Sequence, residues 1–116
     1  MERSARHYYD CPLEASLEII GGKWTQLVLW HLMDGPRRPG KLRRAIGGVS
    51  EKMLLQTLHE LETYGMVQRT SYPEVPPRVE YAFTEKAELL LPALQALCDW
   101  GAEHSGLYQP QENVTA

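Results

Sequence analysis

The chain has 116 residues, which is long enough for one compact domain with its own apolar core. Hydrophobic residues make up 43% and charged residues 23%, as in ordinary globular proteins, and the net charge is −3. Two cysteines are too few for a secreted disulfide scaffold.

The longest apolar stretch, residues 27–32, already contains a histidine, whereas about 20 apolar residues are needed to cross a bilayer. The first residues lack the apolar segment of a signal peptide. We therefore expect a cytoplasmic protein without membrane contact. We expect an N-terminal arm at 1–10, a folded domain at 11–104 and a flexible C-terminal tail at 105–116.

The first half of the chain has the apolar periodicity of helices. Pro12 suits a first helical turn, and the glycine pair at 21–22 suits a helix end. Ser50 suits an N-cap, because its side-chain oxygen accepts a hydrogen bond from a free backbone N–H. The expected helices lie at about 12–20, 23–33, 39–45 and 51–64.

The second half changes its period from helix to strand. Residues 66–72 and 78–83 are expected to be strands, and three prolines in residues 73–77 favour a loop between them. A last helix is expected from a Thr84 cap to about Gly101, kinked at Pro92. The expected fold is mainly α with a small β-hairpin wing, a winged helix-turn-helix.

Positive charge is concentrated in residues 37–52, which we call the basic segment. It holds six basic side chains and one acid, so it carries +5 in a chain whose net charge is −3. Such a segment suits a polyanion, although a solvated helical face would look the same. A winged helix used only for protein contacts stays an alternative, but it would not need this charge.

The helix at 51–64 is expected to lie in the major groove of DNA. Lys52 suits guanine acceptors and Gln56 suits adenine, and the two lie one helical turn apart. Arg43, Arg44 and the hairpin arginines are expected to hold phosphates. Residues expected to face outward or to bind DNA are Arg37, Arg38, Lys41, Arg43, Arg44, Ser50, Glu51, Lys52, Met53, Gln56, Thr57, Glu60, Arg69 and Arg78.

Catalysis finds little support in the sequence, and we expect no enzyme activity, cofactor or metal. The four histidines are scattered, with no Cys/His pair at zinc spacing. No glycine-rich phosphate loop is present. Asp99, Glu103 and His104 are better explained as a solvated helix end than as a weak metal site.

Six motifs stand in order between about Cys11 and Gly101. They are Cys-Pro-Leu at 11–13, Gly-Gly-Lys-Trp at 21–24, Asp-Gly-Pro-Arg-Arg at 34–38, Leu-Arg-Arg at 42–44, Ser-Glu-Lys-Met-Leu at 50–54 and Tyr-Pro-Glu-Val-Pro-Pro-Arg-Val-Glu-Tyr at 72–81. With this set the chain resembles the HxlR-type transcriptional regulators, a MarR-like family. The resemblance implies a bacterial or archaeal repressor or activator that binds operator DNA as a homodimer.

The chain departs from that family pattern at three positions. Pro39 stands where members often carry an aromatic residue, and Thr57 and His59 stand where many carry arginine or lysine. The helix expected to read DNA is therefore less basic than in the family.

The terminal helices carry more apolar residues than one small domain needs, namely Ile19, Leu90, Leu94, Leu97 and Trp100. We expect a homodimer through the N- and C-terminal helices, which would present two recognition helices to an inverted repeat. The alternative is that these side chains fill the core of the monomer.

Cys11 precedes Pro12 near the start of the first helix, where the helix dipole favours a thiolate, although Asp10 and Glu14 oppose this. The resemblance adds that some similar regulators sense oxidants with a cysteine here, whereas many carry it without that role. Cys98 would approach the partner's Cys11 if the terminal helices cross. Either the pair responds to oxidants or electrophiles, or Cys11 is idle and Cys98 is an apolar filler.

Overall fold

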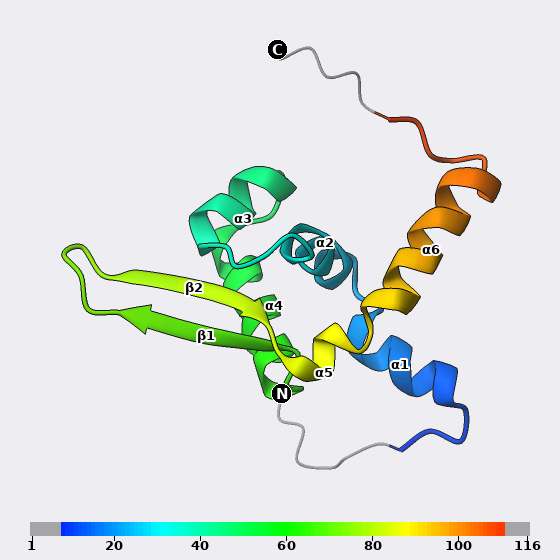
Figure 1. Cartoon of the computed structure of the whole chain (residues 1–116), viewed down its shortest axis with the longest axis horizontal. Helices are drawn as coiled ribbons and strands as arrows, with labels where there is room; N and C mark the ends of the chain where they lie inside the picture. The colour runs from blue at the N-terminus through cyan, green and yellow to red at the C-terminus, as the bar shows by residue number, and fades with distance from the viewer. Residues whose placement is uncertain (1–7, 111–116) are drawn as a thin grey trace.

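The computed structural model describes residues 8–110, and its elements follow the predicted order with one additional break (Figure 1). The residues outside this range include most of the expected N-terminal arm and the last six residues of the expected tail. The elements are α1 (Pro12–Ile20), α2 (Lys23–Leu32), α3 (Pro39–Ile46), α4 (Glu51–Thr63), β1 (Val67–Tyr72), β2 (Arg78–Phe83), α5 (Glu85–Glu88) and α6 (Leu91–His104).

The core lies between α2, α3, α4 and the root of the hairpin. Leu42 of α3 and Leu58 of α4 are fully buried there, as is Val28 of α2. Burial of each such side chain contributes about 1.5–3 kcal/mol. Leu29 of α2 is also buried there. This core fixes the orientation of α3 relative to α4.

The connection between α3 and α4 depends on two glycines and two side-chain contacts. Gly47 and Gly48 have φ values of 72° and 78°, a region that side chains disfavour. Arg43 Nε donates a hydrogen bond of 3.3 Å to the Val49 carbonyl, which closes the turn. Ser50 Oγ accepts from the backbone N–H of Met53 at 3.0 Å, so the predicted N-cap is confirmed.

The hairpin, which we call the wing, consists of β1, β2 and the loop between them. Its strands are antiparallel, from Val67 opposite Phe83 to Tyr72 opposite Arg78 at the loop. Arg37, just before α3, forms an isolated bridge with Tyr81 on β2, with both N–H···O=C bonds formed at 3.0 and 2.9 Å. This bridge attaches the wing to the helix-turn-helix.

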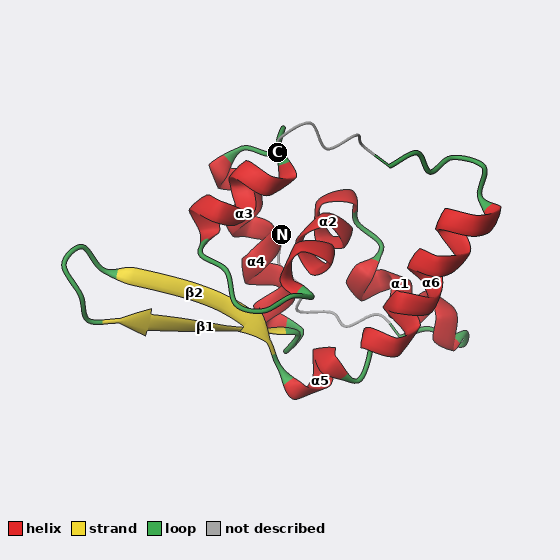
Figure 2. Ribbon diagram, turned by 45° about the horizontal axis from the view of Figure 1, so that its top comes forward, coloured by secondary structure: helices red, strands yellow, loops and turns green. Residues whose placement is uncertain are grey.

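The predicted last helix is two helices. Thr84 caps α5 as expected, with Oγ1 accepting from the Ala87 N–H at 3.3 Å. Pro92 lies in the first turn of the new helix α6, where its missing N–H costs nothing, so it starts a helix instead of kinking one. Figure 2 shows that α6 lies beside α1, on the side of the molecule away from the wing.

Candidate nucleic-acid interface

The outward face of α4 carries both residues that were predicted to read bases. Lys52 and Gln56 are exposed and lie one turn apart. Thr57 is a correction: its side chain is only 5% exposed, so it is not available to DNA. The reason is that residues three and four apart share a helix face, and Thr57 stands three after Leu54 and four before Leu61, both buried. Glu60 is half-buried, not fully outward.

Two further residues of this face were missed. His59 is exposed and stands seven residues after Lys52, so it continues the stripe that Lys52 and Gln56 begin. Leu55 is 41% exposed on the edge of that stripe, where an apolar side chain suits a thymine methyl group. The i, i+4, i+7 spacing from Lys52 is the sequence signal that would have placed His59 on the same face.

Some basic side chains of the basic segment already hydrogen-bond within the protein, and others are exposed. Lys41 and Arg44 are exposed on α3, and Arg38 is exposed just before it. Arg43 already donates to Val49 in the turn, and Arg37 Nη1 donates to the Pro36 carbonyl at 3.2 Å. Within residues 8–110, the exposed cations of α3 and Lys52 lie on consecutive helices joined by a short turn, an arrangement suited to contacts with a phosphate backbone.

The two wing arginines differ sharply. Arg69 is exposed and pairs with Tyr81, three positions inward from the end of the ladder, so it does not lie beside the loop. Arg78 does stand at the loop, but it is engaged by Glu74 and Glu80 at 2.9 and 2.8 Å. Its hydrogen bond to Glu74 raises the pKa of Arg78 and lowers the pKa of that carboxyl group.

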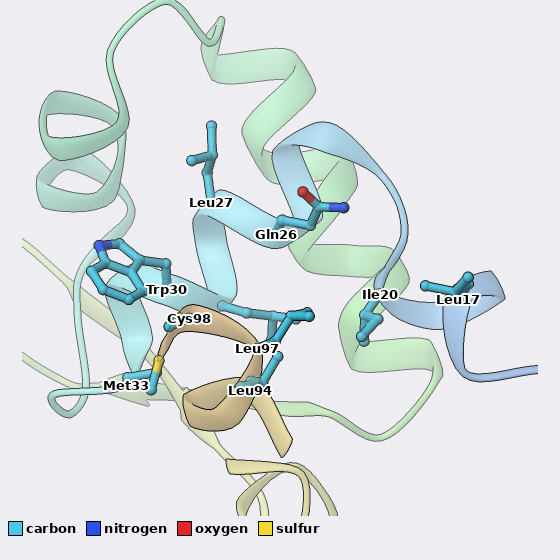
Figure 3. A pocket seen from close by; sticks show the side chains of 10 residues that line it. Leu17, Ile20, Gln26, Leu27, Trp30, Met33, Leu94, Leu97 and Cys98 are labelled. Carbon is cyan, nitrogen blue, oxygen red and sulfur yellow. The ribbon is translucent and has the colours of Figure 1, made fainter. Parts of the chain in front are cut away.

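The apolar surface lies at the other end of the molecule. An open groove of about 380 Å³, the apolar groove, is formed by α1, α2 and α6 (Figure 3). No side chain of α1 or α6 is fully buried. Ile19, Leu90 and Leu94 pack against the core, as the monomer-core alternative expected, whereas Leu97 is 62% and Trp100 58% exposed. The exposure of Leu97 and Trp100 is not what the monomer-core alternative expects.

Both cysteines are free thiols in different surroundings. Cys11 is exposed and is the N-cap residue of α1, without a side-chain capping bond. Cys98 is half-buried on α6 and lines the apolar groove near Trp30 and Met33 (Figure 3).

Other chemistry is not visible in the described part of the chain. In residues 8–110 no three His, Cys, Asp or Glu side chains gather in a way that could hold a metal ion. No helix in that range is both long and apolar enough to span a membrane.

Comparison with known proteins gives a consistent result. Residues 19–108 match the family model described as HxlR-like helix-turn-helix. The chain is 51% identical over 104 residues to the HTH-type transcriptional regulator YkvN of Bacillus subtilis (strain 168), covering 90% of this chain and 85% of YkvN. An HTH-type transcriptional regulator of Methanothermobacter thermautotrophicus is 50% identical over 93 residues, covering 80% of this chain and 71% of that protein.

Among solved structures, the redox regulator HypR in its reduced form has a TM-score of 0.79 and 38% sequence identity, covering 82% of this chain and 94% of that chain. The family match at residues 19–108 extends through the helix-turn-helix, the wing and the whole of α6. This chain belongs to the HxlR-like helix-turn-helix family and is a DNA-binding transcription regulator of the winged helix-turn-helix type.

Proposed function

We propose that the protein binds a specific operator as a homodimer, with α4 in the major groove and the wing beside it. One observation carries this proposal: the outward stripe of Lys52, Gln56 and His59 on α4 adjoins the exposed cations of α3. Lysine and glutamine are chemically suited to base edges, and the neighbouring cations to phosphates. We expect this regulation to take place in the cytoplasm.

Dimerisation is supported by the apolar groove and the exposed residues beside it. Trp30, Leu97 and Trp100 are each more than half exposed, yet they lie on or next to three helices that meet at the groove. Apolar surface of this kind is a common sign of a protein interface. A two-fold axis through α1 and α6 would place two copies of α4 about 34–36 Å apart, one DNA turn, and would favour an inverted repeat.

A response to oxidants or electrophiles is a second part of the proposal. Cys11 is exposed at the positive end of the α1 dipole, where a thiolate is favoured. HypR, which is named a redox regulator, has 38% sequence identity to this chain. Cys98 lines the groove where we place the second subunit. A disulfide between Cys11 and the partner's Cys98 would form as an oxidant takes up two electrons and two thiol protons.

Affinity selection of genomic fragments, followed by sequencing and binding measurements at several salt concentrations, tests the function. If a dimer neutralises about 6–10 phosphates, affinity should fall by roughly 10³–10⁵ between about 50 and 200 mM salt. Enrichment of an inverted repeat with this salt dependence supports the proposal. Selection of no sequence, with protein partners captured instead, would favour a winged helix that serves only protein contacts.

A further inference from the structure

The Arg78 side chain is enclosed by three groups of the wing, which we call the wing clamp. Nη2 and Nε donate to Glu74 Oε2 at 2.9 and 3.2 Å, and Nη1 donates to Glu80 Oε2 at 2.8 Å. The guanidinium carbon lies 3.8 Å from the centre of the Tyr72 ring. Each of the three guanidinium nitrogens therefore has a carboxylate partner, and the ring covers one face of the group.

The charges of the clamp argue against a direct phosphate contact by Arg78. One guanidinium stands between two carboxylates, so the clamp has a net charge of −1. Three of the five N–H donors of Arg78 are already engaged and its side chain is only 24% exposed, so little of its donor capacity is left for a phosphate. Arg38 lies close enough to lower the pKa of Glu74 further, so the basic segment also interacts with the clamp.

The positions of the four residues indicate what the clamp holds. Tyr72 and Arg78 form the last pair of the ladder, Glu74 lies inside the loop and Glu80 lies on β2. The clamp therefore connects the loop to both strands. Prolines at 73, 76 and 77 have no backbone N–H, so side-chain bonds must supply much of the order that a ladder would give.

We propose that Arg78 is a positioning residue for DNA binding: the clamp fixes the wing loop, and the guanidinium does not itself bind phosphate. This replaces the phosphate role that the sequence suggested for Arg78. The inference rests on the proposed function, because it requires the wing to meet DNA. Arg69 and the cations of the basic segment then supply the phosphate contacts.

Glu74→Gln distinguishes a phosphate-binding Arg78 from a loop-positioning Arg78, because the two roles predict different changes in DNA affinity. Removing a negative charge from a surface that meets DNA should strengthen binding or leave it unchanged if Arg78 binds phosphate. If Arg78 positions the loop, Glu74→Gln should weaken operator binding by about threefold to tenfold, because a neutral amide holds the guanidinium less strongly than a carboxylate does. Glu74→Asp, which keeps the charge, should recover part of the loss. Glu88→Gln on α5 is the matched control, since it removes an exposed charge away from the clamp.

Arg78→Lys provides a second test. A lysine keeps the point charge that a phosphate needs, but it cannot bridge two carboxylates with a planar fork. We expect Arg78→Lys to bind as weakly as Glu74→Gln, with faster amide exchange confined to the wing and an unchanged unfolding midpoint. Wild-type affinity in either Glu74→Gln or Arg78→Lys would overturn the inference. If the wild-type protein binds no selected DNA, the proposed function fails instead.

Discussion

The Tyr64 hydroxyl donates a hydrogen bond of 3.3 Å to Glu18 Oε2, which joins residues 46 positions apart in the chain. Tyr64 is the C-cap of α4, and Glu18 lies on α1. The other oxygen of the same carboxylate accepts a hydrogen bond of 2.8 Å from Tyr9, and this bond raises the pKa of Tyr9. The segment that contains Cys11 is thereby connected to the end of the helix that we place in the major groove.

Tyr64→Phe should lower the free energy of unfolding by about 0.5–1.5 kcal/mol, the range for a single hydrogen bond. Chemical denaturation measures this change. Tyr108→Phe is the control, because Tyr108 is exposed beyond α6 and should have no effect. Equal stability of the Tyr64→Phe and wild-type proteins would mean that the bond to Glu18 does not link the two helices in solution.

Lys52→Ala and Gln56→Ala should each cost about 1–3 kcal/mol of operator binding and relax the preference at one base pair. Binding to operator and scrambled DNA measures both effects. Glu62→Ala, an exposed change elsewhere on α4, should leave the preference intact. A loss that is the same on both DNAs would refute base reading by the residue concerned.

Leu97→Glu should shift the protein from dimer to monomer, since it places a charge in the apolar groove that we assign to the second subunit. Sedimentation at low micromolar concentration measures the change. Val75→Glu is the matched control, because Val75 is fully exposed in the loop between β1 and β2. Figure 1 shows that this loop lies at the opposite side of the molecule from α1 and α6. A wild-type protein that sediments as a monomer would contradict the proposed dimer.

Mild peroxide or a quinone should change the DNA affinity of the wild-type protein but not of Cys11→Ser. Non-reducing gels should show a linked dimer only when Cys11 and Cys98 are both present, because the proposed disulfide joins Cys11 of one subunit to Cys98 of the other. Cys98→Ser distinguishes a disulfide from another modification of Cys11. An unchanged affinity and an unmodified Cys11 thiol after treatment would rule out the sensor.

The bounds of most elements could be predicted because each depends on neighbouring residues. Pro12 and Ser50 act through the conformation or hydrogen bonding of their own turn, and the structure agrees at both. Thr57 was misjudged because the leucines alone suggested a narrower buried stripe than the core requires. Pro92 was misjudged because its own preference fits both a kink and a first turn, and the packing of α6 decides between them.

The candidate site was less predictable where it depends on contacts across the chain. The charge of the basic segment is readable from the sequence, but the engagement of Arg43 by Val49 requires the folded turn. Likewise, the clamp on Arg78 follows from the register that places Arg78 opposite Tyr72. The sequence identifies the candidate cations, whereas only the structure separates the engaged ones from the free ones.

The two backbone hydrogen bonds between Arg37 and Tyr81 hold the wing at a set distance from the helix-turn-helix. The hairpin cannot move away from the helix-turn-helix without breaking both bonds, so the span from α4 to the hairpin tip is set before DNA arrives. A duplex whose grooves do not match that span must bend or twist to fit, and the energy required depends on the stiffness of its base-pair steps. We therefore expect selection by this protein to extend to base pairs that no side chain touches.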